Sequence, residues 1–171
     1  ASGGLAGISY ASVVKYDGNG KELWAARADD ASAELLAVDG AGNSYVAGGP
    51  GPILKYDRDG REVWRAPRAD RADIVGLALD PAGNVLVTGN ISGLDLDGAH
   101  FETAKYDPQA RVLWTARFVG GWYARALAVD PQGNVYVTGW SQGSYATVMY
   151  DPDGKELWVA GGPVGHPRAI A

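Results

Sequence analysis

The chain has 171 residues, of which 46% are hydrophobic, and a formal net charge of −5 at pH 7. This length fits about one domain with a packed core, and the hydrophobic fraction excludes a disordered tail. Lysine and arginine are intermixed with aspartate and glutamate, which argues against a nucleic-acid partner, and no apolar run approaches the ~18 residues of a membrane-spanning helix. The absence of cysteine excludes disulfides, thiolate metal sites and a cysteine nucleophile.

Two motifs alternate along the chain. The first begins with Tyr-Asp and ends with tryptophan, and its copies are YDGNGKELW at 16–24, YDRDGREVW at 56–64, YDPQARVLW at 106–114 and YDPDGKELW at 150–158. The second is built around Asp-x-x-Gly-Asn, and its copies are AVDGAGNSYVAG at 37–48, ALDPAGNVLVTG at 78–89 and AVDPQGNVYVTG at 128–139. Self-similarity at a period of about 20 to 50 residues indicates a repeat architecture.

The segments that flank these motifs read as short strands. Apolar runs such as ELLAVD, VYVTG, TVMYD and ELWVA are rich in Val, Tyr, Trp, Leu and Thr, and Gly, Asp, Asn and Pro bound them. We name the four strands of each repeat A to D in chain order. Four short antiparallel strands in each repeat predict an all-β fold, which is a β-propeller or a propeller segment of four-stranded antiparallel blades.

We expect one propeller domain over 1–171 with about four repeats visible. A partial repeat covers about 1–30, complete repeats cover 31–69, 70–119 and 120–161, and a partial strand covers 162–171. One interpretation is a piece of a longer propeller, or a subunit whose ends a partner covers. The other is a small ring in which the last strand closes the first blade. We favour the first, because about ten residues of the closing A–B hairpin are missing from such a ring, and because bare sheet edges promote aggregation unless another chain covers them.

The aromatic residues of the first motif fit a packing role. Stacked blades bury each other's faces, and each large aromatic side chain buries about 150–250 Å². We assign this role to the tryptophan that ends each copy and to the tyrosine that begins it: Trp24, Trp64, Trp114, Trp158, Tyr16, Tyr56, Tyr106 and Tyr150.

The succession of AVDPQGNVYVTGW and ATVMYDPDGKELW resembles the bacterial seven-bladed β-propeller repeat, and the resemblance covers nearly the whole chain. It implies the propeller fold and a secreted, periplasmic or cell-surface bacterial protein, but no particular activity. Strand D is also similar to the quinoprotein (PQQ-type) repeat, in which Gly-Lys-x-x-Trp closes a blade. Repeats of the NHL type share the Asp-x-x-Gly-Asn turn.

The two rims of the predicted propeller differ in variability. The A–B and C–D turns share one rim and barely change between repeats, whereas the B–C and D–A segments share the other rim and differ in every repeat. The variable segments include 27–34, 66–73, 90–102, 117–124 and 140–146. Divergent loops on a rigid scaffold are the usual place for recognition.

Two tryptophans lie outside the repeat, and both fall in variable segments. Trp122 has Tyr123 beside it, and Trp140 is followed by Tyr145. Aromatic side chains that the blade pattern does not use suit a binding patch. The alternative is that they cover the core or pack against the adjacent blade.

A mixed-charge cluster occupies the D–A segment of the second repeat. Its candidate binding residues are Arg68 and Arg71, which lie among Arg65, Asp70 and Asp73. The alternative is a solvated network of ion pairs with no ligand.

The sequence carries no convincing catalytic signature. The two histidines, His100 and His166, are far apart without ligand spacing, and no nucleophile elbow, Walker loop or dinucleotide motif occurs. Asp95 and Asp97 have the spacing of a calcium loop, but the third oxygen ligand and the final glutamate of an EF-hand are missing. We therefore expect no enzyme, no catalytic residue, no metal and no cofactor.

The sequence thus predicts a non-catalytic binding or assembly module, an accessory subunit whose variable rim contacts a protein. The expected partner is another subunit or a second copy of the chain that completes the propeller, and the expected location is extracellular, periplasmic or on the bacterial surface. One alternative is a fragment of a larger quinoprotein-like enzyme whose catalytic groups lie in other blades. Another is a carbohydrate-binding propeller in which Trp122, Tyr123 and Trp140 stack on sugar rings.

Overall fold

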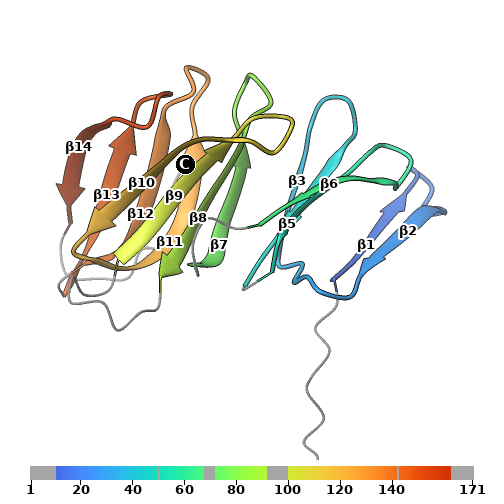
Figure 1. Ribbon diagram of the computed structural model, residues 1–171, viewed down its shortest axis with the longest axis horizontal. Helices are drawn as coiled ribbons and strands as arrows, with labels where there is room; N and C mark the ends of the chain where they lie inside the picture. Colours follow the sequence, from blue (N-terminus) through green and yellow to red (C-terminus); the bar gives the residue numbers. More distant parts are fainter. Residues whose placement is uncertain (1–10, 50, 68–71, 92–99, 142, 163–171) are drawn as a thin grey trace, which may run out of the picture.

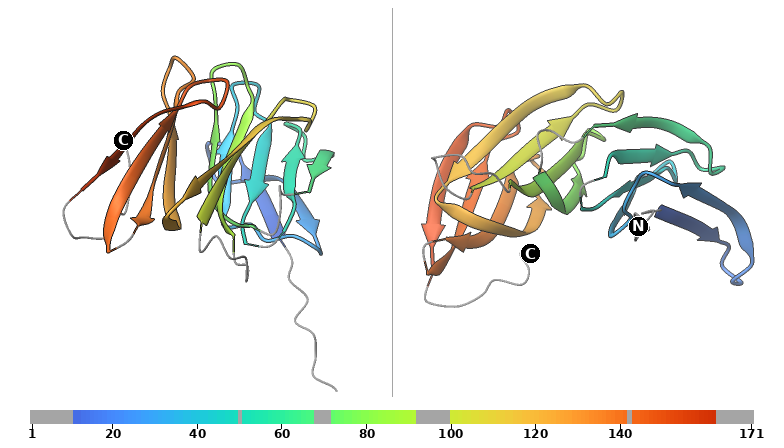
Figure 2. Two further views of the ribbon diagram at one scale, coloured as in Figure 1. Left: turned by 60° about the vertical axis from the view of Figure 1, so that its left-hand side comes forward. Right: turned by 60° about the horizontal axis from the view of Figure 1, so that its bottom comes forward.

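The computed structural model describes residues 11–49, 51–67, 72–91, 100–141 and 143–162. Within these ranges the chain forms fourteen strands and no helix. The strands make one two-stranded sheet and three four-stranded sheets, all antiparallel, which follow one another along an arc (Figure 1; Figure 2). This confirms the predicted all-β propeller fold of four-stranded blades.

The sheets contain the strands in chain order. The first sheet pairs β1 (Ala11–Tyr16) with β2 (Glu22–Ala28). The second contains β3 (Leu35–Val38), β4 (Ser44–Ala47), β5 (Ile53–Tyr56) and β6 (Glu62–Ala66). The third contains β7 (Ala72–Leu79), β8 (Val85–Ile91), β9 (His100–Tyr106) and β10 (Val112–Val119). The fourth contains β11 (Gly121–Val129), β12 (Val135–Ser141), β13 (Ser144–Tyr150) and β14 (Glu156–Gly161).

The aspartate of each C–D turn organises that turn. Asp17 Oδ1 accepts the backbone N–H of Asn19 at 2.8 Å and of Lys21 at 2.9 Å, and the other three C–D turns repeat this pair of bonds. The fourth residue of each turn has a left-handed φ, of 80° at Gly20, 84° at Gly60 and Gly154, and 67° at Ala110. Glycine suits this position because it has no Cβ to clash.

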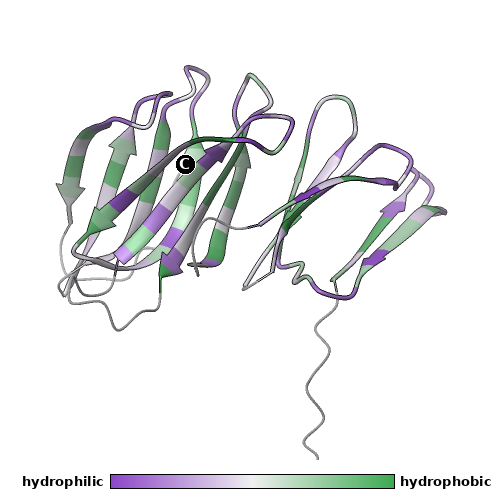
Figure 3. Ribbon diagram, in the orientation of Figure 1, coloured by the Kyte–Doolittle hydropathy of each residue, from purple (hydrophilic) through white to green (hydrophobic). Residues whose placement is uncertain are grey.

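The hydrophobic core lies between the sheets rather than inside one of them. Figure 3 shows hydrophobic residues along the strands and hydrophilic ones at the turns. Between the third and fourth sheets, Leu86 of β8 packs with Val135, Val148 and Tyr150. Each four-stranded sheet therefore depends on a neighbour to keep its apolar face from water.

A tryptophan on the last strand of a sheet contacts the C–D turn of the next sheet. Each indole N–H donates to the carbonyl oxygen of the second turn residue: Trp24 to Arg58 at 2.9 Å, Trp64 to Pro108 at 3.0 Å and Trp114 to Pro152 at 3.0 Å. The ring also covers the turn glycine, since a Cβ on Gly154 would lie 2.5 Å from Trp114 and one on Gly60 would lie 2.6 Å from Trp24. We call this arrangement the indole–turn contact.

The two ends of the arc lack this arrangement in the described part of the chain. Trp158 is 43% exposed, and Tyr16 is 57% exposed. In contrast, Tyr56, Tyr106 and Tyr150 are buried at the junctions between sheets. The repeat aromatics therefore pack where a neighbouring sheet is present and remain exposed where none is described.

The A–B turns use a similar aspartate, with one variation that buries a charge pair. Asp130 accepts bonds from the backbone and side chain of Asn134 and from the Tyr136 hydroxyl, and Asp39 has the matching partners. The third sheet has Leu86 in place of this tyrosine. There Lys105 Nζ lies 2.9 Å from Asp80 Oδ2, and the two side chains are 6% and 4% exposed.

Lys105 joins this pair to the next sheet. Its ammonium also donates to the Pro152 carbonyl oxygen at 3.0 Å, the same oxygen that accepts the Trp114 indole. Burial raises the pKa of Asp80, but the hydrogen bonds from Asn84 and Lys105 outweigh it and hold the pKa below its ordinary value. Asp80 is therefore ionised at neutral pH inside the junction.

Replacing Gly154 by alanine should lower the free energy of unfolding by about 2 kcal/mol or more, because a left-handed Cβ is strained and would also displace Trp114. Gly83, with φ of 81°, has no atom within 4 Å of an added Cβ, so it provides a matched control. Gly83→Ala should cost only the backbone strain, about 1 kcal/mol. Urea unfolding of the three proteins measures both effects, and equal losses would contradict the indole–turn contact.

Replacing Lys105 by methionine, the residue at the same place in the last repeat, should cost about 3 kcal/mol at neutral pH, because it leaves a buried carboxylate without its cation. A carboxyl group whose pKa is lower in the native state than in the unfolded state stabilises the fold at a pH above its unfolded pKa. This stabilisation is lost as the pH falls through the native pKa. The difference between wild type and variant should therefore narrow as the pH falls below the ordinary value of 3.8 for Asp80.

Lys55→Met provides the control for the buried pair. Lys55 occupies the same repeat position, but its Nζ lies 5.0 Å from the centre of the Tyr45 ring. An interaction of that kind contributes about 0.5–2 kcal/mol, with the higher values where the pair is desolvated, and it should not depend on pH near 4. The unfolding experiments should run from pH 7 to pH 3, which is about one unit below the ordinary pKa of aspartate. A loss of stability in Lys105→Met that stays the same over this range would refute the charge-pair account.

Candidate functional site

The four aromatic candidates gather on the fourth sheet, at the end away from the C–D turns. Strand pairing sets Tyr123 opposite Trp140, and Trp140 opposite Tyr145. Directly paired residues share one face of a sheet, so these three side chains, which we call the aromatic row, lie side by side. Trp122 is the extra residue at a register shift between Gly121 and Tyr123.

These residues lie on strands, although the sequence predicted loops for 117–124 and 140–146. β10 leads into β11 through Gly120 alone, and two residues separate β12 from β13. Left-handed φ values of 93° at Gly120 and 89° at Gly143 allow these abrupt connections. The prediction of loops was wrong here, because strand pairing extends through the variable segments. The aromatic side chains are thus positioned by a sheet.

Exposure differs among the four. Trp122 is 47% and Tyr123 is 52% exposed, whereas Trp140 and Tyr145 are partly buried. Tyr145 covers Gly162, leaving no room there for a Cβ, and its carbonyl accepts the Gly162 N–H at 3.0 Å. Trp122 and Tyr123 are therefore the accessible part of the group.

The aromatic row faces away from the third sheet. In the third sheet, Asn90 and Phe101 stand at the positions of Trp140 and Tyr145. Asn90 Oδ1 accepts the N–H of Ala124 at 2.6 Å, and Phe101 leaves no space for a Cβ on Gly121. Both contacts are made to strand A of the next blade. The repeat positions of Trp140 and Tyr145 are therefore positions through which one blade contacts the next.

A hollow of about 520 Å³ lies on the same face at the end near the turns. Its lining residues are Ala128, Val129, Asp130, Pro131, Tyr136, Thr147 and Trp158. The lining is mostly apolar. We call the surface formed by this hollow and the aromatic row the outer face.

The one carboxylate in the hollow is fully engaged by its own turn. Burial raises the pKa of Asp130, but hydrogen bonds from Asn134 and Tyr136 hold it below its ordinary value. Burial raises the pKa of the Tyr136 hydroxyl, and its bond to Asp130 adds to that effect. A low-pKa carboxylate with its oxygens occupied is poorly suited to accept a proton at neutral pH. The geometry favours binding of apolar groups over acid–base chemistry.

The mixed-charge cluster is a surface network where the structure describes it. Arg65 bridges Glu62 at 2.9 Å and Asp30, near the end of β2, at 2.7 Å. Hydrogen bonds with Arg65 lower the pKa of both carboxyls, and those with Glu62 and Asp30 raise the pKa of the guanidinium. All three side chains reach solvent, so the network contributes little to stability.

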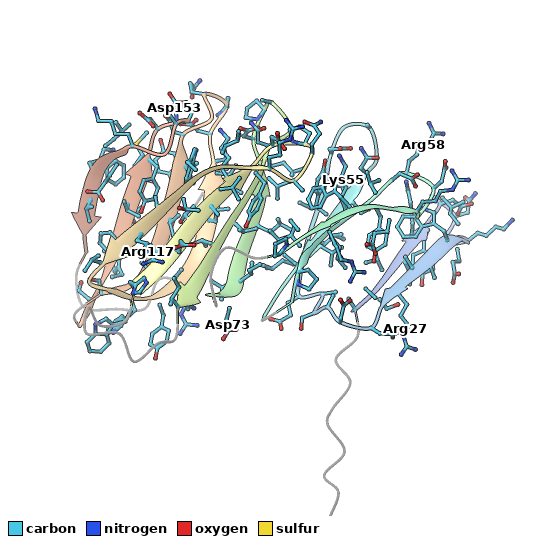
Figure 4. The ribbon with its side chains drawn as sticks, in the orientation of Figure 1. Arg27, Lys55, Arg58, Asp73, Arg117 and Asp153 are labelled. Atoms are coloured by element: carbon cyan, nitrogen blue, oxygen red, sulfur yellow. The ribbon has the colours of Figure 1, made fainter. Side chains whose placement is uncertain are left out.

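The other members of that cluster lie mostly outside the described part of the chain. Arg68 and Arg71, with Asp70, lie outside the described residues. Asp73 is exposed at the edge of the third sheet (Figure 4). Their assignment as binding residues stays a prediction.

The remaining polar candidates have structural roles or lie outside the described residues. His100 is buried at the start of β9, and His166, Asp95 and Asp97 lie outside the described residues. The Asp57 carboxylate accepts two N–H groups of its own turn. The described ranges contain no group of three or more His, Asp or Glu side chains able to hold a metal ion. They also contain no helix long and apolar enough to cross a membrane.

Tyr136 and Thr147 are outer-face residues that the sequence did not single out. Tyr136 follows Asp130 by six residues, as Tyr45 follows Asp39, so the repeat made it look purely structural. The Tyr136 side chain lines a hollow because the described residues include no blade beside it. No pattern in the sequence indicated this exposure.

Solved structures share the fold. A protein of unknown function from Bacteroides caccae matches with a TM-score of 0.62 and 17% identity over 95% of this chain and 61% of its own. The Dos1 propeller matches with a TM-score of 0.63 and 17% identity over 88% of this chain and 42% of its own. Virginiamycin B lyase from Staphylococcus aureus matches with a TM-score of 0.61 and 12% identity over 95% of this chain and 50% of its own.

At these identities the likeness shows the propeller fold alone. The chain spans 61% or less of the length of each of these three proteins. No curated protein matches it by sequence.

Two family models match the sequence. A beta-propeller repeat matches residues 113–146, which confirms the resemblance drawn from the repeated motifs. The family described as outer membrane protein assembly factor BamB matches residues 9–100, which is more than half of the chain. The chain therefore belongs to that family of β-propeller proteins.

Proposed function

We propose that the chain is a non-catalytic protein-binding module that serves as an accessory subunit of a larger assembly in the bacterial envelope. The observation that carries the proposal is the exposed pair Trp122 and Tyr123, which a four-stranded sheet presents beside Trp140 and Tyr145. Tryptophan and tyrosine are enriched among the residues that dominate binding energy at protein interfaces.

The rigidity of this group supports a binding role. Its residues lie in paired strands, so a partner would order few additional torsions on contact. Preorganised aromatic side chains lose little conformational entropy when they bind. Apolar surface of this kind is costly to leave in water, and on a folded protein it commonly marks an interaction site.

The placement of the ionisable groups supports a non-catalytic role. The Asp80–Lys105 pair is enclosed between two sheets, where a substrate cannot reach it. Asp130 is the carboxylate of the outer hollow, and its own turn engages it. Both carboxylates contribute to the stability of the fold, and this role accounts for their positions.

The family description supports assembly and an envelope location. The family is described as that of an outer membrane protein assembly factor, and a protein of that kind contacts other proteins. The propeller of virginiamycin B lyase shows that the same fold also supports an enzyme. A part of a larger propeller enzyme is therefore the competing function, with its catalytic groups outside this chain.

Carbohydrate binding is a second candidate, and the aromatic row favours it. Adjacent rings of Tyr123 and Trp140 on one sheet face offer surfaces on which sugar rings stack. A glycan array probed with the chain separates this candidate from protein binding, because hits that disappear with Trp140→Ala would favour it.

The double variant Trp122→Ala, Tyr123→Ala should weaken partner binding about tenfold or more, because truncation of each interface aromatic commonly costs over 1 kcal/mol. The bait is the whole chain, and the measurement is recovery from a bacterial envelope extract followed by titration of the recovered protein. The control is Val63→Ala, Leu113→Ala, which removes exposed apolar side chains from outer strands of other sheets. Unchanged binding by the Trp122 and Tyr123 variant would place the contact elsewhere.

A further inference from the structure

We propose that the hollow beside Trp158, on the outer face of the fourth sheet, binds the first sheet of a second copy of this chain, with Trp158 of one copy packed on Tyr16 and Gly20 of the other. This head-to-tail contact goes beyond the proposed function and does not depend on it. It repeats between two molecules an arrangement that each molecule already contains three times.

The internal junctions define what such a contact requires. The indole donates to the carbonyl of the second turn residue and covers the turn glycine. The ring also lies against the tyrosine that opens the turn, with ring centres 6.5 Å apart for Trp24 and Tyr56 and 6.1 Å apart for Trp114 and Tyr150. A complementary surface therefore needs a tyrosine, a carbonyl and an uncovered small residue at the fourth position of the turn, which is Gly60, Ala110 or Gly154 at the internal junctions.

Trp158 is already placed for this contact. Its ring centre lies 6.1 Å from that of Tyr136, and the same pair in the second sheet, Trp64 and Tyr45, is 6.0 Å apart. Trp64 uses that position to reach Pro108 of the next sheet. Trp158 instead borders the hollow of about 520 Å³ and is flanked by exposed Leu157 and Val159.

The first sheet carries the matching acceptor. Gly20 has φ of 80° and no atom within 4 Å of an added Cβ, whereas indoles cover the equivalent Gly60 and Gly154. Tyr16 is 57% exposed, whereas the equivalent Tyr56 is 3% exposed. The Gly18 carbonyl stands at the acceptor position of the turn. Among the described residues, the Trp158 indole N–H is thus an unused donor and the Gly18 carbonyl an unused acceptor of the indole–turn contact.

The two surfaces lie at opposite ends of the described arc. Figures 1 and 2 place β1 and β2 at one end of the arc and β14 at the other. A second copy brings the same two surfaces within reach, and such a heterologous contact either closes a ring or continues as a chain. The described residues of two copies together contain eight sheets, two of them two-stranded, and about four to eight blades is the usual range of propellers.

The aromatic row stays accessible in this arrangement. In the third sheet, Asn90 at the row's equivalent position contacts β11, which is strand A of the following blade. The first sheet contains only β1 and β2, the C and D strands, in the described part of the chain. A second copy would therefore cover Trp158 while the surface proposed for another protein remains open.

One residue makes this junction weaker than two of the three internal ones. Lys15 and Lys105 each donate to the carbonyl that also accepts the indole, at 3.2 Å to Arg58 and 3.0 Å to Pro152. The fourth sheet has Met149 at that position.

Analytical ultracentrifugation of the whole chain over a range of concentrations tests the proposal. We expect concentration-dependent association that Trp158→Ala and Gly20→Asn each weaken about tenfold or more, as truncation of a central interface aromatic does. Asparagine tolerates the left-handed conformation, so Gly20→Asn blocks the contact with little strain. Gly83→Asn, at φ of 81° in open space, is the matched control and should associate as wild type does.

Mixing the two blocked variants separates a head-to-tail contact from any other. Trp158→Ala keeps an intact first sheet and Gly20→Asn keeps an intact Trp158, so the mixture should form a heterodimer and nothing larger. A wild type that stays monomeric throughout, or a mixture that stays monomeric while wild type associates, would overturn the proposal.

The outcome is distinguishable from failure of the proposed function. Trp122→Ala should leave self-association unchanged, and Trp158→Ala should leave binding of the envelope partner unchanged. If either single variant lost both self-association and partner binding while circular dichroism showed an intact fold, the claim that the two surfaces are separate would be contradicted.

Discussion

The structure depends on one repeated interaction, in which an indole N–H binds the carbonyl of the next sheet's C–D turn. A propeller blade has two apolar faces and cannot bury both alone. The indole–turn contact fixes how far the next blade lies from Trp24, Trp64 or Trp114, because the hydrogen bond sets the distance. At the junctions of Trp24 and Trp114 the turn glycine also permits the close approach of the ring. Burial of Tyr56, Tyr150 and the strand residues around them follows from that spacing.

The sequence was sufficient to predict this framework because its signals are local. Strand propensity, the Asp-x-x-Gly turns and the nine-residue repeat all act within a few residues, and the structure has the expected sheets. The self-bonding of Asp17 to the backbone two residues on is a local interaction of this kind. The repeat also predicted that a tryptophan such as Trp64 would pack between blades, as it does.

The features that the sequence did not predict depend on the register between strands and on contacts with neighbouring sheets. The face to which Trp140 belongs is decided by its pairing with Tyr123 and Tyr145 across three strands. The Asp80–Lys105 pair joins residues far apart in the chain, and Leu86 is the only local sign that its blade differs. The variable segments 117–124 and 140–146 were mistaken for loops, because divergence between repeats was read as a lack of regular structure.

The most direct test of this account is solvent exchange of the four repeat indole N–H protons, measured by NMR on the whole chain at low protein concentration. The account predicts slow exchange for Trp24, Trp64 and Trp114, whose protons are bonded across junctions, and fast exchange for Trp158. Slow exchange of Trp158 should appear only as the concentration rises and copies associate. Fast exchange of all four protons in the folded protein would contradict the indole–turn contact.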